Sequence, residues 1–142
     1  MRDMQTDHAT LNRVLIVEDD LIIALDLEDT VIGYGFEVAG LASSLEHALS
    51  LAPMSDIAFV DVNLSDGASG PAIGRILAED FGITVVFMTG NAEAVADGVQ
   101  GTLGVVSKPV SPQTVEATLN YVAARRSNGV AVVPAMLKVF TD

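Results

Sequence analysis

The chain has 142 residues, half of them hydrophobic and none of them cysteine, which indicates one globular domain with a single core and excludes disulfides and thiol chemistry. No apolar run approaches the length of a membrane span, and the polar first residues carry no signal-peptide core, so we expect a cytoplasmic protein with no membrane partner. The formal net charge of −12, with only seven Lys and Arg residues, argues against nucleic-acid partners, because binding to phosphate backbones requires clustered basic side chains.

Apolar runs of strand length alternate with segments of helical spacing along the chain. A leader of residues 1–12, which we expect to be flexible, precedes the first run. The expected strands occupy residues 14–17, 36–41, 57–60, 83–88 and 105–107. The expected helices occupy residues 23–31, 43–52, 72–81, 92–104 and 112–126. Five such alternations predict an α/β fold, a single doubly wound domain with a five-stranded parallel sheet and helices on both faces.

Short motifs mark where several of these helices begin. Ser43 and Glu46 form a capping box that opens the second helix. Ser111 is a helix cap followed by Pro112 at the first helical position. The segment 92–104 contains three glycines. Each costs about 1 kcal/mol relative to alanine inside a helix, so we expect only a short, weak helix there.

Polar residues follow four of the expected strands. Glu18 and Asp19 come after the first strand, Asp61 after the third, and Thr89 and Lys108 after the fourth and fifth. The carboxyl ends of parallel strands meet at one sheet edge, so we expect these side chains to converge. Three carboxylates in one pocket repel each other unless a cation neutralises them, and oxygen ligands without Cys or His favour Mg²⁺. One carboxylate could then act as a nucleophile on a phosphoryl group, with the Lys and Thr stabilising charge.

Each of these residues also has an ordinary structural interpretation. The Glu18–Asp19 pair is equally typical of a helix N-terminus, where acidic side chains are favoured, and a strand-end Asp is more often a cap or turn residue. Thr89 alone carries no signal, and Lys108 taken alone is a surface residue. Their joint occurrence, one set per strand and in order, favours a site. We interpret His47, on the polar face of its helix, as a surface residue rather than a phosphotransfer group.

These residues lie in four motifs that resemble the receiver domain of two-component response regulators over residues 13–126. The motifs are Val14–Asp20, Phe59–Leu64, Phe87–Gly90 and Ser107–Val110. The resemblance implies a flavodoxin-like (βα)5 fold. It further implies a single-domain response regulator that takes phosphate from a sensor histidine kinase or a phosphotransfer protein. Such a protein signals by protein–protein interaction and is a switch rather than a turnover enzyme.

The resemblance assigns a role to each carboxylate. Asp61 matches the phosphoacceptor of the family. Glu18 and Asp19 match the acidic pair that holds Mg²⁺ together with the phosphoacceptor and the backbone carbonyl at position 63. The implied Mg²⁺ ligands are therefore Glu18, Asp19, Asp61 and the carbonyl of Asn63.

The resemblance also assigns the remaining polar residues. Thr89 matches the residue that bonds a phosphoryl oxygen and reports its presence, and Lys108 matches the residue that pairs with the phosphoryl group. Asn63 and Asn91 occupy positions that tune the dephosphorylation rate in the family. Capping of the two loops explains these asparagines about as well.

Three features depart from the common pattern of the family. Val105 stands where an aromatic switch residue is usual, Ser65 stands where proline is usual, and the interval between Thr89 and Lys108 is short and rich in glycine. These features resemble a stand-alone subfamily with a Phe-Ala-Thr-Gly-Gly/Tyr motif, best known from alphaproteobacteria. We therefore expect the switch to work by ordering of the 92–104 segment rather than through an aromatic at position 105.

Two other function classes stay open at this point. A phosphatase of the haloacid dehalogenase type also uses a strand-end Asp and Mg²⁺, but it requires a second Asp where this chain has Asn63. A degenerate receiver that serves only as a binding module is the other. The complete set of polar residues at the strand ends argues against that second class.

The tail of residues 127–142 is apolar and is too short for an output domain. It could pack on its own domain, pair with a second copy of the chain, or dock on a partner. Dimerisation through the tail, or through the last strand and helix, is open as well.

Overall fold

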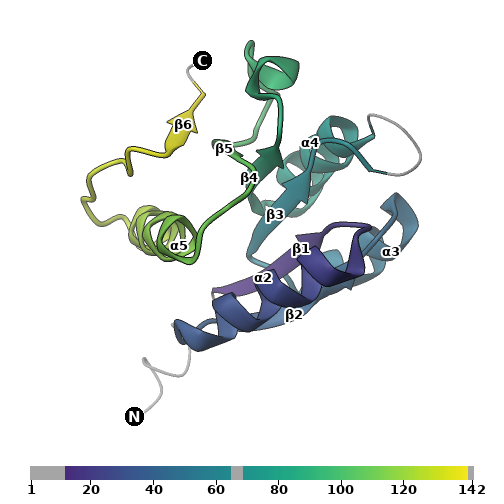
Figure 1. Ribbon diagram of the computed structural model, residues 1–142, viewed down its shortest axis with the longest axis horizontal. Coiled ribbons are helices and arrows are strands. Elements are labelled where there is room, and N and C mark those ends of the chain that lie inside the picture. Colours follow the sequence, from purple (N-terminus) through teal and green to yellow (C-terminus); the bar gives the residue numbers. More distant parts are fainter. Residues whose placement is uncertain (1–11, 65–68, 141–142) are drawn as a thin grey trace.

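The computed structural model describes residues 12–64 and 69–140, which form a sheet with helices on both faces (Figure 1). The strands are β1 (Arg13–Val17), β2 (Glu37–Ala42), β3 (Ile57–Asp61), β4 (Thr84–Thr89), β5 (Gly104–Ser107) and β6 (Leu137–Val139). The α-helices are α2 (Leu21–Gly33), α3 (Leu45–Leu51), α4 (Gly70–Phe81) and α5 (Pro112–Arg126). Two 3₁₀ turns, η1 (Ala52–Met54) and η2 (Ala92–Val95), complete the described elements. Within these residues, no helix is both long and apolar enough to cross a membrane.

The strand order is β2-β1-β3-β4-β5-β6. The first five strands pair in parallel, and β6 runs antiparallel to β5. This is the doubly wound order in which the chain changes direction between β1 and β3 and leaves a crevice at their carboxyl ends. The predicted α/β class and doubly wound sheet are confirmed. The predicted count of five strands is wrong, because part of the tail adds a sixth.

The segment between β4 and β5 is not the helix that we predicted over residues 92–104. Only Ala92–Val95 form a turn of 3₁₀ helix. Gly98 and Gly101 follow with φ angles of +85° and +84°, in the left-handed region that a right-handed helix excludes. The glycines therefore break the helix rather than merely weaken it, and four α-helices remain in the described part of the chain.

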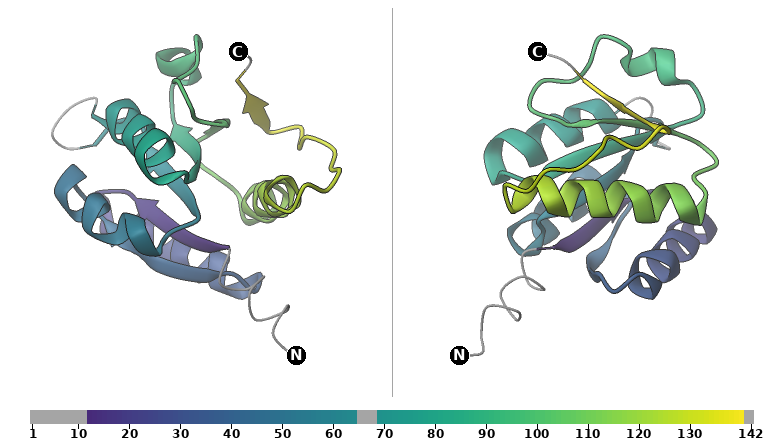
Figure 2. Two further views of the ribbon diagram at one scale, coloured as in Figure 1. Left: turned by 180° about the vertical axis from the view of Figure 1, so that it is seen from behind. Right: turned by 90° about the vertical axis from the view of Figure 1, so that its left-hand side faces the viewer.

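The sheet is buried between two hydrophobic clusters. Alternate side chains of β1 point to opposite faces, so Val14 and Ile16 belong to one cluster and Leu15 and Val17 to the other. The first cluster is closed by α2 and α5, and the second by α3 and α4, in agreement with the positions of the helices in Figures 1 and 2. A strand buried on both faces explains the near-continuous apolar runs of the sequence.

The helix caps agree with the sequence in one case and differ in another. The hydroxyl of Ser111 accepts a hydrogen bond from the Thr114 amide at 3.1 Å, as the Ser-Pro motif predicts. The predicted capping box at Ser43 is wrong, because Ser44 caps α3 instead and accepts from the His47 amide at 3.2 Å. The helix therefore begins one residue later than expected, with Leu45 partly exposed.

The end of the tail packs on its own domain. Figure 2 shows the chain leaving α5, doubling back past this helix and reaching the edge of the sheet as β6. Leu137 is buried in the cluster below α2 and α5, and Phe140 packs against the cluster on the opposite face. Of the three alternatives for the tail, packing on its own domain is the one observed for residues 137–140.

Close packing of α4 on the sheet generates a prediction about Gly74. A Cβ atom at Gly74 would lie 2.4 Å from the buried ring of Phe87, so Gly74→Ala should lower the free energy of unfolding by about 1–3 kcal/mol although alanine favours helix. Gly33→Ala is the matched control, since nothing lies within 4 Å of its Cβ position, and it should gain about 0.5–1 kcal/mol. Urea unfolding of both variants checks this. Equal changes in the two variants would contradict the packing argument.

Candidate functional site

The polar residues at the strand ends lie together at one edge of the sheet. Glu18 directly follows β1, Asp61 and Thr89 are the last residues of β3 and β4, and Lys108 directly follows β5. The parallel register aligns these ends: Asp61 lies opposite Met88, the residue before Thr89, and Thr89 lies opposite Ser107. The predicted convergence is therefore observed, at the carboxyl ends of the strands where open α/β sheets bind ligands.

Three carboxylates form the centre of this site. One carboxylate oxygen from each of Glu18, Asp19 and Asp61 lies within 4.8 Å of the others. Glu18 and Asp61 are each only 4% exposed, so water screens their mutual repulsion poorly. A donor set made only of oxygen atoms fits a hard divalent cation such as Mg²⁺, and these three side chains are the ones that could hold it.

Lys108 provides positive charge at the same place. Its Nζ atom lies 3.0 Å from Oε1 of Glu18 and 3.2 Å from Oδ2 of Asp61. Burial alone lowers the pKa of Lys108, but the hydrogen bond to Glu18 and the charges of both carboxylates outweigh it and raise the pKa above its usual value. The ammonium group therefore stays protonated between two buried acids.

The pKa of Glu18 is raised, mainly because burial disfavours its charged form, and the neighbouring Asp61 adds to the shift. Two groups oppose it: the backbone amide of Asp20, which donates to Oε2 of Glu18 at 3.1 Å, and Lys108. One ammonium group does not offset the free energy that it costs to hold these carboxylates ionised and out of water. The chemistry of the donor set thus favours a further cation.

Asp20 is a residue of this site that the sequence analysis did not single out. Its side chain caps α2 and accepts from the amides of Ile22 and Ile23 at 3.0 and 3.2 Å, while its own amide orients Glu18. The first turn of α2 holds no acidic residue. Glu18 and Asp19 therefore stand before the cap and outside the first turn, and Asp20 is the acidic residue that caps the helix. The sequence does carry a signal for this cap, since an Asp directly before an apolar run of helical spacing is typical of an N-cap.

The loop after β3 holds Asp61 in place. The amide of Asn63 donates to Oδ1 of Asp61 at 3.1 Å, and the Asn63 side chain is exposed. Gly70, at the start of α4, lies so close that a Cβ atom there would be 2.1 Å from the Asp61 carbonyl oxygen. The sequence analysis missed Gly70 as well, because only the folded chain shows this approach. The residues at 65–68, which include the expected departure at Ser65, lie outside the described part of the loop.

Thr89 is fully buried, and its hydroxyl is bonded to the loop that follows β4. It donates to the carbonyl of Asn91 at 3.2 Å and accepts from the Asn91 amide at 3.0 Å. The Asn91 side chain caps η2 by accepting from the Glu93 amide at 3.2 Å. Asn91 is thus a loop cap in this structure, and a role for it or for Asn63 in dephosphorylation stays a prediction.

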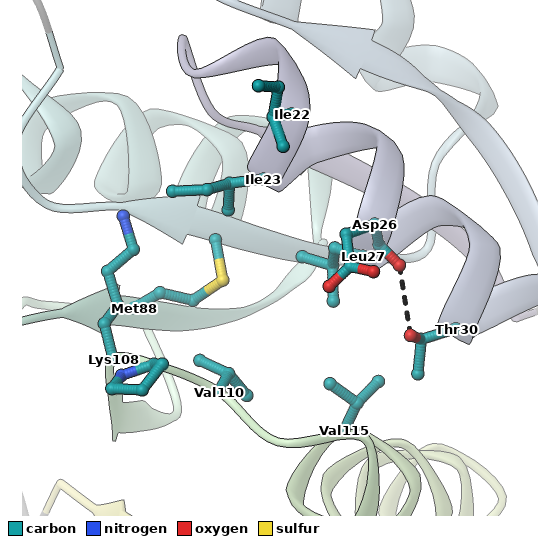
Figure 3. A pocket seen from close by; sticks show the side chains of 10 residues that line it. Ile22, Ile23, Asp26, Leu27, Thr30, Met88, Lys108, Val110 and Val115 are labelled. Atoms are coloured by element: carbon teal, nitrogen blue, oxygen red, sulfur yellow. Dashed lines mark hydrogen bonds between the residues drawn. The ribbon is translucent and has the colours of Figure 1, made fainter.

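An apolar groove adjoins the carboxylates on the α2 side. It has a volume of about 460 Å³ and is lined by side chains of α2, β4, the loop after β5 and α5 (Figure 3). Figure 3 shows Ile22 and Ile23 of α2 facing Lys108 and Val110 across it. Ile22 is 80% exposed, and the adjacent Leu21, the first residue of α2, is 64% exposed. Large apolar side chains are therefore exposed to solvent directly beside the charged site.

Comparison with protein families gives a match to the response regulator receiver domain at residues 14–120. The chain is 32% identical over 123 residues to the phyllosphere-induced regulator PhyR of Methylorubrum extorquens, a match that covers 84% of this chain and 45% of that protein. The chain therefore spans less than half the length of this relative. The match covers the family as a whole, and membership of the stand-alone motif subfamily stays a prediction.

Solved structures give a similar result. The solution structure of the receiver domain of PhyR from Erythrobacter litoralis superposes with a TM-score of 0.71 at 29% identity, covering 86% of this chain and 96% of that one. The response regulator PhyR from Brucella abortus superposes with a TM-score of 0.66 at 28% identity, covering 88% of this chain and 54% of that one. Both relatives are response regulators by name.

The raised pKa of Glu18 generates a prediction about pH. Since its pKa in the folded chain lies above its unfolded value, ionised Glu18 opposes folding as the pH rises through the folded pKa, and a bound cation removes that cost. Millimolar Mg²⁺ should therefore raise the midpoint of thermal unfolding more at about pH 7.5 than at about pH 5. Glu18→Gln, which does not titrate, should reduce this difference. Equal Mg²⁺ effects at both pH values would contradict the prediction.

Proposed function

The chain belongs to the response regulator receiver domain family, and on that premise we propose that it is a Mg²⁺-dependent phosphoacceptor switch. Asp61 accepts a phosphoryl group from the phosphohistidine of a sensor histidine kinase or of a phosphotransfer protein. The output is a change in protein–protein contacts in the cytoplasm rather than turnover of a substrate. The observation that carries the proposal is the buried cluster of Glu18, Asp19 and Asp61 with Lys108 bridging two of its members.

The chemistry is a transfer from nitrogen to oxygen. A carboxylate oxygen of Asp61 attacks phosphorus, the bond between phosphorus and the donor histidine nitrogen breaks, and that nitrogen keeps the electron pair. Mg²⁺ held by Glu18, Asp19 and Asp61 would neutralise charge on the phosphoryl oxygens. The Asn63 amide, which donates to Asp61 Oδ1, fixes the orientation of the nucleophile.

Lys108 and Thr89 stabilise the product. Lys108 Nζ already contacts Asp61 Oδ2 at 3.2 Å, so a small displacement brings it to an oxygen of the added phosphoryl group. The Thr89 hydroxyl, at the end of the neighbouring strand, supplies a neutral donor once it leaves the Asn91 carbonyl. Both groups move only locally, because each is fixed to the end of a buried strand.

The phosphodonor docks on α2 and on the loop that carries Pro109 and Val110. The donor histidine has to reach Asp61, and the groove beside Lys108 is the apolar surface next to that point. The exposed side chains of Leu21 and Ile22 extend it along the first turn of α2. A helix with an apolar face fits such a groove, with a polar histidine directed at the carboxylates.

Substitution of the phosphoacceptor tests the transfer. Asp61→Asn should abolish acid-labile phosphorylation by a kinase or by acetyl phosphate, since an amide oxygen is a poor nucleophile toward phosphorus. Asp80→Asn is the matched control, because Asp80 lies exposed at the far end of α4 and its loss should leave labelling unchanged. Labelling is followed by intact-protein mass spectrometry. Undiminished labelling of the Asp61 variant would contradict the proposal.

Substitution of the groove tests the docking surface. Ile22→Ser should lower the rate of transfer from a histidine kinase by about tenfold, because it removes an exposed apolar contact at the edge of the groove. Labelling by acetyl phosphate, which needs no docking, should not change. Ile32→Ser, at the opposite end of α2 and also exposed, is the control. A kinase-specific loss in both variants, or in neither, would contradict this placement of the donor.

A further inference from the structure

The strand β6 pairs with β5, the strand that Lys108 follows. In its register with β5, Val139 lies opposite Gly104, Lys138 opposite Val105 and Leu137 opposite Val106. Lys108 follows the end of the same strand β5. The sheet edge that β6 covers is therefore only one strand away from Thr89 on β4 and directly continuous with Lys108.

Gly104 makes room for this strand. A Cβ atom at Gly104 would lie 2.3 Å from the Lys138 carbonyl oxygen and 3.1 Å from Cα of Val139. Backbone atoms cannot yield as the end of a flexible side chain can, so any larger residue would push β6 away. The edge of β5 is shaped for a strand at this position.

Phe140, directly after β6, contacts three parts of the domain at once. Its amide donates to the Leu103 carbonyl at 2.9 Å, just before β5. Its ring lies with its centroid 6.4 Å from that of Phe87 on β4. It also packs against the backbone of Gly98, where a Cβ atom would be 3.4 Å from Cβ of Phe140. Phe140 thus fills the space over β4 where the predicted helix over residues 92–104 is missing.

The segment between β4 and β5 connects Phe140 to the site. Its first residues are fixed by the two hydrogen bonds between Thr89 and Asn91. Its middle is held by the buried side chain of Val95 and by the contact of Gly98 with Phe140. The whole segment has one turn of 3₁₀ helix and two glycines with positive φ, which is little regular structure to resist movement.

The connection between α5 and β6 allows the strand to leave. Residues 129–134 form no helix or strand, and Val130 and Val132 are fully or almost fully exposed. β6 itself has three residues. A short edge strand on an exposed connection can detach without disturbing α5.

We propose that the edge of β5 and the space over Phe87 form a strand-docking site, which residues 137–140 of the chain occupy, and that the state of Asp61 controls its occupancy. The coupling rests on the proposed phosphoacceptor function. The Thr89 hydroxyl has one proton, so donating it to a phosphoryl oxygen breaks the bond to the Asn91 carbonyl. The 91–103 segment then moves away from Phe140, and β6 is released.

Amide exchange in the full-length chain measures this release directly. The Phe140 amide, now bonded to Leu103, should exchange about tenfold faster when Mg²⁺ and the phosphoryl analogue beryllofluoride are added, as expected for the loss of one hydrogen bond. Trypsin cleavage after the exposed Lys138 should rise in parallel. Gly104→Ala, which expels β6 by steric contact, should show the same fast exchange without the analogue and calibrates the detached state.

A second pair of variants tests the coupling without any phosphoryl analogue. Thr89→Val removes the hydroxyl that holds Asn91, and it should by itself accelerate exchange of the Phe140 amide about tenfold. Thr118→Val is the matched control. Thr118 is equally buried, in α5, and its hydroxyl has no hydrogen-bond partner among the described residues, so Phe140 exchange should not change.

The outcomes separate the two proposals. If the analogue shifts the amide signals of Asp61 and Lys108 while Phe140 exchange stays constant in its presence, the coupling is overturned and the phosphoacceptor function stands. If the analogue causes no shift at Asp61, the phosphoacceptor function fails and control of β6 by Asp61 fails with it, and Thr89→Val then tests only whether the bonds between Thr89 and Asn91 hold β6 in place. The coupling between Thr89 and β6 is overturned if the Phe140 amide exchanges at the unmodified rate in Thr89→Val but fast in Gly104→Ala.

Discussion

The structure depends on the placement of three carboxylates within 4.8 Å of one another at a largely buried edge of the sheet. Such a group is unfavourable on its own, since charges buried without partners cost several kcal/mol each. Lys108 contacts two of the three and lowers this cost, and the Asp20 amide lowers it further. The raised pKa of Glu18 shows that the compensation is partial. A small divalent cation would lower the remaining cost, and these oxygen ligands suit one.

The fold supplies the geometry for this placement. Glu18 and Asp61 come from β1 and β3, the two neighbouring strands between which the chain changes direction, so no crossover connection covers the crevice at their ends. Lys108 reaches the same point from β5, two strands away, over the end of β4. These strands are buried between the two hydrophobic clusters, and such core elements are the last to open locally. Movement is therefore expected in the loops beyond the strand ends, such as residues 91–103, rather than in the strands.

Part of this arrangement could be predicted from the sequence, because polar residues at the ends of apolar runs have to meet at one edge when the strands are parallel. Glu18, Asp61, Thr89 and Lys108 follow from that rule and from the motifs around them. Distances and hydrogen-bond partners do not follow from the sequence. The bridging contact of Lys108 and the orientation of Glu18 by the Asp20 amide depend on side-chain conformations that no pattern encodes.

The remaining differences have specific physical causes. Glycine propensity predicts only a weaker helix at Gly98 and Gly101, but their left-handed backbone excludes a helix altogether. The sequence does not decide the place of the tail, because an apolar stretch with Pro134 fits an edge strand, a dimer contact and a docking peptide equally well. The tail fits the edge of β5 because Gly104 has no side chain and leaves room for the Lys138 backbone. That complementarity is visible only between segments distant in sequence.

We expect the carboxylate cluster to bind Mg²⁺ as part of a phosphoacceptor site. The most direct measurement is a titration of the unmodified chain with Mg²⁺, followed by the backbone amide signals in NMR spectra. We predict saturable shifts that centre on Glu18, Asp19, Asp61 and Lys108 and that diminish toward Asp56, which directly precedes β3 at the opposite end of the sheet. Spectra that do not respond to Mg²⁺, or that respond only at exposed acidic residues distant from Asp61, would contradict it.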